Sequence, residues 1–447
     1  MSKDVANRQQ SFNENLLQFL QRSPTPFHAV ASMAQLLDSA NFHRLDETQH
    51  WQLAHNSRYY VLRNDSALIA FKTGLADSAN PGIRLVGTHT DSPCLKIKPL
   101  PQIMQQGYLQ LGVEVYGGAL LHPWFDRDLS IAGRVDFETG AGQLGSTLID
   151  LQRPVAFIPS LAIHLDRSAN DGRKINRQTE LPPLLMQLPT EQEVSFDQLL
   201  LQWVQATEAG ESAEKVLAHE LLLYDTQPPS ILGLEKQFIA SARLDNLLSC
   251  FIAVQALIDS EDTGASLLVC NDHEEVGSAS SSGAQGPFLK VVLERLIGGL
   301  SAGTEQQSGV FTTELIQRVI RQSILLSIDN AHGVHPNYKD KHDESHRPLL
   351  NGGPVIKINA NQRYASNSQS IALFKSLCDR LDVPHQSFVM RSDMACGSTI
   401  GPITATEIGI TTVDIGLASF AMHSIRELAG AEDPLLLADV VTAFYSR

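Results

Sequence analysis

Two adjacent glutamates, Glu274 and Glu275, follow an apolar run at residues 265–270. The run predicts a buried strand, and the glycine- and serine-rich stretch 277–283 predicts a loop behind it. A carboxylate that binds a metal ion beside one that accepts a proton is an arrangement that hydrolysis can use. Two consecutive glutamates are more often a solvated turn, so this interpretation needs support from other motifs.

A second motif places a histidine and an aspartate at the end of another apolar strand. Residues 83–87 predict this strand, and His89 and Asp91 follow it with one residue between them. A metal-binding imidazole needs an acceptor for its second ring nitrogen, and a carboxylate this close in sequence can provide one. The alternative is that 88–92 is only a polar turn before Pro93.

Two further carboxylates and one histidine occupy comparable positions. Asp245 precedes the apolar positions of a predicted helix, where it would either cap the helix or bridge two metal ions with its two oxygens. Asp329 ends the predicted strand 324–328, and His423 follows the apolar stretch 411–416. A lone histidine is more often structural than ligating. Nitrogen and oxygen donors of this kind suit zinc, with manganese or cobalt as alternatives.

Several long motifs, in this order, resemble the aspartyl aminopeptidases, which are dinuclear zinc exopeptidases. The motifs are GTHTDSP at 87–93, WFDRDL at 124–129, DHEEVGS at 272–278, IKIN and QRY within 356–364, CGSTIGP at 396–402, and MHSIRE at 422–427. The resemblance covers nearly the whole chain. It implies an α/β fold, with a mixed-sheet zinc-exopeptidase catalytic domain and an inserted β-rich oligomerisation domain.

The resemblance also assigns roles to the residues of these motifs. It implies that Asp245 bridges the two zinc ions, that Glu274 is the general base, and that Asp91 orients His89. The implied metal ligands are His89, Asp245 and Asp329 for one ion, and Asp245, Glu275 and His423 for the other.

The substrate implied by the resemblance is a peptide with an amino-terminal Asp or Glu. A chain with 34 Lys and Arg against 49 Asp and Glu has a formal net charge of −15, so binding an acidic residue requires cationic groups concentrated at the pocket. Lys357, on a probable strand, is the leading candidate, although a lysine whose charged end reaches solvent is the alternative. Arg391 and His335 are weaker candidates.

Assembly is a further implication of the resemblance. It implies a homododecamer of tetrahedral form, in which a histidine from a neighbouring subunit reaches the active site, and His164 matches that position. A surface histidine beside a strand is the plain alternative.

The organisation of the chain follows from its alternating pattern. Strands and helices alternate at both ends, whereas short alternating runs separated by glycines fill the middle. We therefore expect a catalytic domain formed by residues 1–93 and 238–447, with an inserted β-rich assembly domain at 94–237. Within the catalytic domain we expect helices at 12–19, 27–37 and 434–445, the last capped by Asp433.

Composition excludes several classes of protein. The negative charge argues against nucleic acid as a partner. No apolar run approaches the roughly 18 residues that a membrane span requires. Five cysteines without a CxxC pair favour a reducing, cytoplasmic compartment. The glycine-rich stretch 298–309 reads as a mobile loop near the pocket or a disordered surface segment.

Rival interpretations remain open at this point. A metallo-aminopeptidase of broad or neutral specificity, or a related carboxypeptidase or amidohydrolase, would use the same metal ligands. A non-enzymatic cage protein would keep the metals for structure, but a structural site has no use for a base such as Glu274.

Overall fold

The computed structural model describes residues 3–74, 82–188, 194–301 and 313–447. The chain divides into two compact units. The first unit contains residues 1–91, 229–422 and 427–447, and the second contains residues 92–228 and 423–426. The main segment of the second unit, 92–228, begins two residues before the insertion expected at 94–237 and ends nine residues before its end.

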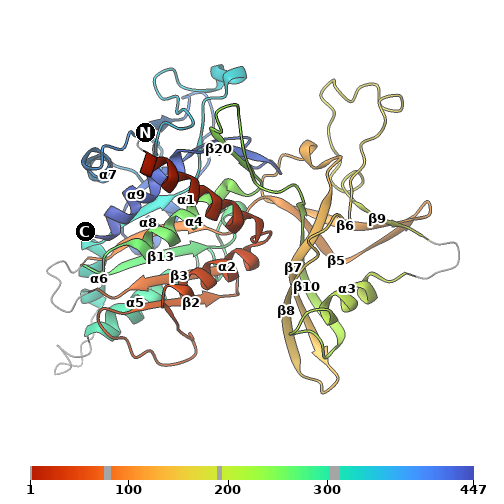
Figure 1. Cartoon of the computed structure of the whole chain (residues 1–447), viewed down its shortest axis with the longest axis horizontal. Coiled ribbons are helices and arrows are strands. Elements are labelled where there is room, and N and C mark those ends of the chain that lie inside the picture. Colours follow the sequence, from red (N-terminus) through yellow and green to blue (C-terminus); the bar gives the residue numbers. More distant parts are fainter. Residues whose placement is uncertain (1–2, 75–81, 189–193, 302–312) are drawn as a thin grey trace. The chain divides into compact units, whose positions relative to one another are not determined.

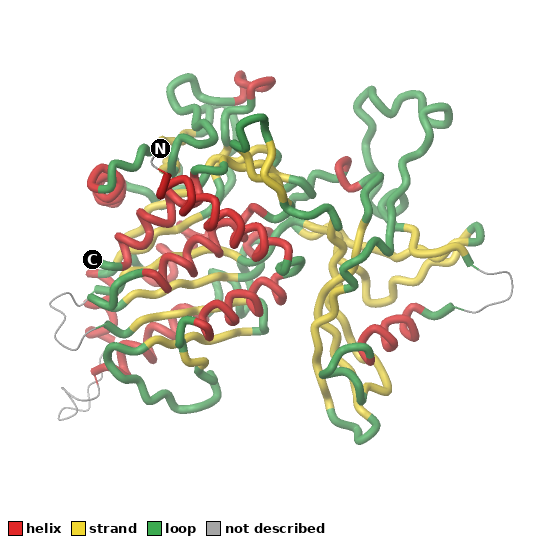
Figure 2. Tube along the Cα trace, in the orientation of Figure 1, coloured by secondary structure: helices red, strands yellow, loops and turns green. Residues whose placement is uncertain are grey.

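A nine-stranded mixed sheet forms the first unit (Figures 1 and 2). In spatial order its strands are β1 (His43–Arg44), β2 (Arg58–Arg63), β3 (Ala67–Lys72), β13 (Ser266–Asn271), β4 (Arg84–His89), β14 (Ile324–Ile328), β18 (Thr411–Gly416), β16 (Val355–Ile358) and β17 (Gln386–Val389). The helices of this unit are α1 (Lys3–Gln21), α2 (Pro26–Ser39), α4 (Leu244–Asp259), α5 (Phe288–Ser301), α6 (Thr313–Gln322), α7 (Ser368–Arg380), α8 (Ile400–Ile408) and α9 (Asp433–Tyr445). The predicted α/β architecture is confirmed.

Helices cover both faces of this sheet, which explains why its central strands read as continuous apolar runs. Successive side chains of a strand point to opposite faces. In β13, Leu268 packs into a core shared with α1, α2, α4, α7 and α9, whereas Leu267 and Val269 pack against α5 and α6 on the other side. Figure 1 shows α1, α2, α4 and α9 lying across one face.

Four central strands run in the same direction, and this positions the candidate site. β13 pairs parallel with β4, β4 with β14, and β14 with β18. The register aligns Asn271, the last residue of β13, with His89, the last residue of β4. The carboxyl ends of these strands therefore meet at one edge of the sheet, where open α/β sheets bind ligands.

A smaller sheet completes the first unit. Its five strands, in spatial order, are β11 (Ser230–Leu232), β12 (Phe238–Ser241), β20 (Glu427–Gly430), β19 (Ala418–Phe420) and β15 (Ala331–His332). β19 and β15 pair in parallel and lie just after β18 and β14 along the chain. This sheet thus continues the edge at which the central strands end.

The second unit is an antiparallel sheet of six strands with one packed helix. Its strands, in spatial order, are β8 (Leu144–Asp150), β7 (Leu129–Thr139), β10 (Ala213–Asp225), β5 (Cys94–Gln105), β6 (Tyr108–Tyr116) and β9 (Leu184–Gln187). Helix α3 (Phe196–Gln205) adds Phe196, Leu200 and Val204 to the core of this unit. Short 3-10 turns occur at His122–Trp124 here, and at Glu274–Val276 and Pro336–Lys341 in the first unit.

Two local predictions need correction. Asp433 is the first residue of α9 and not its cap, which is Glu432; its carboxylate instead accepts the main-chain N–H groups of Asn351 and Gly353. Residues 298–301 of the expected loop belong to α5, and 302–309 lie outside the described residues.

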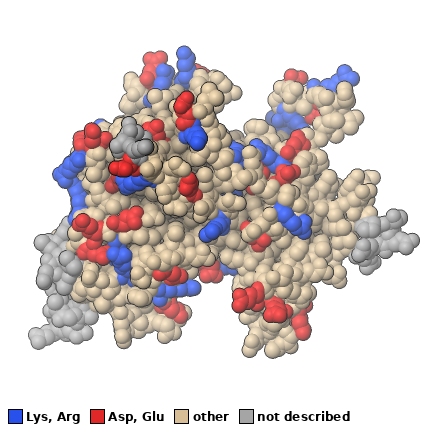
Figure 3. All heavy atoms as spheres, viewed as in Figure 1, with Lys and Arg blue, Asp and Glu red and all other residues tan. Residues whose placement is uncertain are grey.

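Two surface properties bear on partners. No helix within the described ranges is long and apolar enough to cross a membrane. On the face seen in Figure 3, acidic and basic side chains are interspersed, and the basic ones form no continuous stripe.

Candidate active site

The ends of three parallel strands and the start of α4 bring the predicted ligands together. His89 ends β4, Glu274 and Glu275 lie in the 3-10 turn after β13, and Asp329 directly follows β14. Among the described residues of the first unit, two groups have ligand atoms that all lie within 4.8 Å of one another: His89 with Asp245 and Asp329, and His89 with Glu274 and Glu275. Residues far apart in the sequence thus form one cluster of donors.

His89 presents one ring nitrogen to this cluster. Its Nε2 lies 3.4 Å from Oδ1 of Asp245 and 3.6 Å from Oδ1 of Asp329. Its Nδ1 lies 3.0 Å from the main-chain oxygen of Asp91 and 3.4 Å from Oδ1 of the same residue. Because oxygens surround Nδ1, a proton on Nδ1 leaves the Nε2 lone pair directed at the carboxylates, as a metal ligand requires.

Asp91 also holds the turn that carries the two glutamates. Its Oδ1 accepts the main-chain N–H of Glu274 at 3.1 Å, and its Oδ2 accepts that of Glu275 at 3.0 Å. Asp91 is 1% exposed, so these charge-assisted bonds are shielded from water. The carboxylate predicted to orient His89 therefore contacts all three neighbours.

Asp245 does not cap a helix, contrary to the alternative reading of its position. The residue before α4 is Arg243, and Asp245 has non-helical backbone angles of φ −84° and ψ 102°. The Asp245–Asn246 peptide bond is cis. The main-chain N–H of Asp245 donates to Oε2 of Glu427 at 2.8 Å. The side chain, 3% exposed, lies with the carboxylates of the cluster.

Burial and like charge shift the acidities in this cluster. Burial raises the pKa of Glu274 to about 7; His89 opposes this, and Asp329, Asp245 and Asp91 add to it. Burial, followed by the charge of Asp245, raises the pKa of Glu275 well above its usual value. For His89, burial lowers the pKa, but contacts with three aspartates outweigh it and raise the pKa well above 6.5.

These shifts test whether the residues fit a metal ion. Several buried carboxylates around one imidazole leave an excess of negative charge, which ordinarily costs folding free energy unless cations offset it. Oxygen and imidazole nitrogen are the donors that zinc, manganese and cobalt accept. The donor set therefore fits a divalent metal.

Lys357 supplies one cation inside this cluster. It lies on β16 and is 1% exposed. Its Nζ is 3.3 Å from Oδ2 of Asp329 and 3.1 Å from the main-chain oxygen of Asn330. The ring of Tyr364 lies 5.2 Å away. Lys357 therefore contacts a candidate metal ligand directly.

A cavity of about 240 Å³ lies beside the strand ends that carry the ligands. It combines one lysine and three histidines with apolar walls. Its lining is His332, Gly333, His335, Lys341, His342, Phe388, Met390, Met394, Ser419, Phe420, Ala421 and Met422. Of the four predicted substrate-binding residues, only His335 is in this lining.

Arg391 is half-buried, and His164 is exposed. Arg391 pairs with Asp393, with Nε–Oδ1 and Nη2–Oδ2 distances of 2.8 Å and 2.6 Å. The guanidinium of Arg391, a candidate for substrate binding, is therefore already paired with a carboxylate. His164 is exposed in a run of turns of the second unit.

His423 belongs to the short segment 423–426 that groups with the second unit. Its main-chain oxygen accepts the N–H of Leu120, and its Nδ1 lies 3.3 Å from the main-chain oxygen of Gly118. A Cβ at Gly118 would lie only 3.2 Å from that nitrogen. Nδ1 thus lies beside an oxygen acceptor, which is the arrangement that a metal-binding imidazole uses for its second ring nitrogen.

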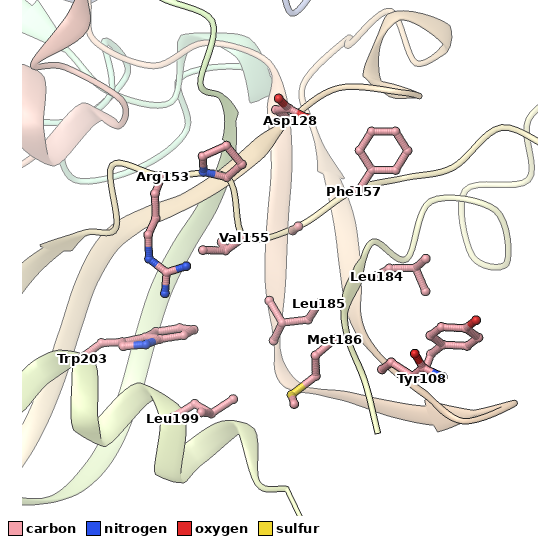
Figure 4. Close-up of a pocket in the computed structure, with 13 residues that line it drawn as sticks. Tyr108, Asp128, Arg153, Val155, Phe157, Leu184, Leu185, Met186, Leu199 and Trp203 are labelled. Atoms are coloured by element: carbon pink, nitrogen blue, oxygen red, sulfur yellow. The ribbon is translucent and has the colours of Figure 1, made fainter. Parts of the chain in front are cut away.

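A different hollow, of about 500 Å³, lies in the second unit (Figure 4). Strand β9, residues 153–157 and helix α3 form its walls, and Leu185, Met186, Leu199 and Trp203 face into it. Its charged lining residues are Asp128 and Arg153. Because none of the predicted ligands lines it, we place the candidate active site at the sheet edge of the first unit.

Sequence reasoning missed two residues that contact the backbone of this site. Glu427 lies in the motif at 422–427 and Asn246 follows Asp245, but neither was assigned a role. Asn246 donates from Nδ2 to the main-chain oxygen of Ile328 at 2.8 Å. The signals that the sequence offered were the place of Glu427 in that motif and an asparagine directly after a proposed ligand.

Comparison with known proteins agrees with this geometry. The family model for aminopeptidase I zinc metalloproteases (M18) matches residues 19–445. A probable M18 family aminopeptidase 2 from Pseudomonas fluorescens (strain SBW25) is 56% identical over 437 residues, 98% of each chain. One from Ectopseudomonas mendocina (strain ymp) is 57% identical over 433 residues, 97% of each chain.

Solved structures have the same fold. A chain in the structure of the Ape4 and Nbr1 complex has a TM-score of 0.92 at 38% identity, covering 100% of this chain and 87% of the other. The S. cerevisiae mApe1 dodecamer has a TM-score of 0.82 at 29% identity, covering 99% and 97%.

Proposed function

Since the chain belongs to the M18 family of zinc metallo-aminopeptidases, we propose that it removes amino-terminal Asp and Glu residues from peptides with the help of two metal ions. The observation that carries this proposal is the cluster of one imidazole and four carboxylates, buried or half-buried, at the ends of β4, β13 and β14 and the start of α4. A carboxylate base beside metal-binding groups is what hydrolysis of a peptide bond needs.

Five side chains would hold two zinc ions, with manganese or cobalt as possible replacements. His89, Asp245 and Asp329 would bind one ion, and Asp245, Glu275 and His423 the other. The position of His423 in the chain supports its proposed role as a ligand, because it directly follows Met422 of the cavity lining. It is also only four residues from Glu427, a span of at most about 14 Å. Bound zinc supplies a Lewis acid for the scissile carbonyl and lowers the pKa of the attacking water.

Glu274 would act as the general base. It takes the proton of the attacking water and then delivers it to the nitrogen of the leaving peptide. Asp91 holds the main chain of Glu274 and so fixes where this carboxylate points.

The Glu274→Gln variant tests this role. We expect normal zinc content with turnover reduced by about 10²-fold or more, because the amide cannot accept the proton. The matched control is Glu275→Gln, which we expect to lose zinc as well as activity. Metal analysis and peptide hydrolysis on the same preparations give both quantities. Near-normal turnover of the zinc-loaded Glu274→Gln enzyme would disprove the base.

Specificity for acidic residues is the finer part of the proposal. Lys357 within the cluster and Lys341 in the lining of the 240 Å³ cavity place two cationic groups near the site in a protein of net charge −15. Matched peptides that begin with Asp, Glu, Ala, Leu or Lys, assayed with and without a chelator, test it. Chelator-sensitive cleavage of the acidic peptides alone is expected. Cleavage of all five would leave a broad-specificity aminopeptidase, and cleavage of none by metal-loaded protein would favour a cage protein.

Assembly and location complete the proposal. The related S. cerevisiae mApe1 is a dodecamer, and we propose the same state here. In such an assembly the exposed His164 would reach the active site of a neighbouring subunit. All five cysteines are free, which supports a reducing cytoplasmic location.

A further inference from the structure

Two buried side chains hold the backbone on either side of the Asp245 carboxylate. Glu427, on β20, accepts the main-chain N–H of Asp245 at 2.8 Å. Asn246 donates from Nδ2 to the main-chain oxygen of Ile328, also at 2.8 Å. Glu427 is 2% exposed and Asn246 is 0% exposed, so water does not compete for these bonds.

The two contacts connect three separate elements of the first unit. Glu427 connects the start of α4 to the five-stranded sheet, and Asn246 connects it to the last residue of β14. The next residue after Ile328 is Asp329, which lies with Asp245 around His89. The distance between two carboxylates on different elements is therefore set by main-chain hydrogen bonds close to each of them.

We propose that Glu427 and Asn246 are positioning residues, which hold Asp245 at the place where its two oxygens can serve two ions. This inference rests on the metal site proposed above. A side chain that bridges two ions tolerates little displacement, because both metal–oxygen distances change when its backbone moves. Residues that orient metal ligands typically contribute about 10–100-fold to metal affinity. Glu427 acts through the main chain of Asp245, and a side-chain oxygen that accepts this N–H is the feature that the role requires.

Three substitutions at Glu427 separate position from charge. Glu427→Gln keeps an oxygen acceptor at the same reach, so we expect zinc affinity within about threefold of the parent protein. Glu427→Asp keeps the charge but withdraws the oxygens by about 1.5 Å, one carbon–carbon bond. Glu427→Ala removes the acceptor. We expect both the Asp and the Ala variants to bind zinc at least about 10-fold more weakly.

Asn246 provides an independent variant of the same contact. Asn246→Asp is nearly isosteric but replaces the donor that faces the oxygen of Ile328 with an acceptor. We expect at least about 10-fold weaker zinc binding here too. Equal zinc affinity in this variant and the parent would remove Asn246 from the proposal.

The matched control is Asp433→Ala. Asp433 is another fully buried carboxylate that accepts main-chain N–H groups, from Gly353 at 2.8 Å and Asn351 at 2.7 Å, but it contacts no proposed ligand. Its loss is expected to lower the unfolding temperature of the metal-free protein without changing zinc affinity. A residue with a purely structural role is expected to give this combination of lowered unfolding temperature and unchanged zinc affinity.

Zinc affinity is measured by competition with a chromophoric chelator, and unfolding of the metal-free protein is measured in parallel. The order Glu ≈ Gln > Asp ≈ Ala at position 427 supports the proposal. The order Glu ≈ Asp > Gln would assign the effect to charge, and unchanged affinity in all variants with lowered unfolding temperature would leave only a structural role. Both results overturn the proposal. Failure of the parent protein to bind zinc would instead refute the metal site itself.

Discussion

Lys357 could either recognise an acidic substrate or support the metal site through Asp329. A Lys357→Met variant separates these two roles. Its ammonium has three N–H donors. The described structure gives it two oxygen acceptors, on Asp329 and Asn330, at 3.3 Å and 3.1 Å. The third donor would serve the side chain of an acidic substrate. Methionine has a similar length without the charge, so the substitution removes the cation and keeps most of the packing.

The size of the expected effect follows from burial. Lys357 is 1% exposed, and removing one partner of a desolvated charged pair typically costs about 2–5 kcal/mol. A loss of about 3 kcal/mol corresponds to a decrease of about 10²-fold in kcat/KM. If Lys357 recognises the substrate, this decrease applies to peptides beginning with Asp or Glu, and peptides beginning with Ala or Leu change by less than about threefold.

The assay compares kcat/KM for Asp and Ala peptides with the zinc content of each preparation. An unchanged ratio of the two kcat/KM values would refute recognition by Lys357. If the zinc content of the variant also falls, we would conclude that Lys357 supports the metal site through its contact with Asp329. Lys72→Met is the matched control. Lys72 is equally buried and pairs with Asp262 at 3.0 Å, on an element without proposed ligands. It is expected to reduce stability and leave the ratio unchanged.

Three other predictions concern packing, pH and assembly. A Cβ at Gly401 would lie 2.3 Å from Oδ1 of the fully buried Asp414, so Gly401→Ala is expected to cost about 2–3 kcal/mol in urea unfolding, and a cost below about 0.5 kcal/mol would contradict this clash. Burial raises the pKa of Asp433 to about 6 from 3.8, so its proton stabilises the fold at low pH and this stabilisation is lost as the pH rises through about 6. The stability of the parent protein relative to Asp433→Asn should therefore fall by about 1 kcal/mol from pH 5 to pH 7, and a pH-independent difference would count against the shift. If His164 acts in a neighbouring subunit, dissociating and reassembling equal amounts of His164→Ala and Glu274→Gln enzymes should restore about a quarter of the parent activity, whereas a site contained in one chain would restore none.

The elements that carry the ligands could be predicted because each combines an apolar run with a polar end. A strand covered by helices on both faces must be apolar throughout, so the first polar residue marks the edge of the sheet. His89, Glu275 and Asp329 are recognisable on this basis, since all three follow such runs. The parallel pairing of β13, β4 and β14 then brings them together.

The start of α4 was harder to predict, because local sequence suggests a different role for Asp245. An aspartate before an apolar helix normally accepts the N–H groups of the first turn, and that is a local interaction. Here Arg243 precedes the helix, and the N–H of Asp245 is bound by a residue 182 positions away. Asp245 could cap the helix or be held by Glu427, and only the assembled sheets determine which of these two arrangements forms.

The contacts that surround the ligands were beyond sequence reasoning for a related reason. Asp91, Asn246 and Glu427 act on main-chain groups, and every residue except proline offers the same N–H and C=O. The side chain of the residue whose main chain is bound therefore does not indicate that contact. The spacing of residues in the sequence does not indicate it either. Asp91 was assigned to the imidazole of His89 because histidine is a recognisable partner, whereas its bonds to two N–H groups of the glutamate turn were not foreseen. Metal ligands can be read from residue type, but the groups that fix their positions become visible only when the backbone is placed.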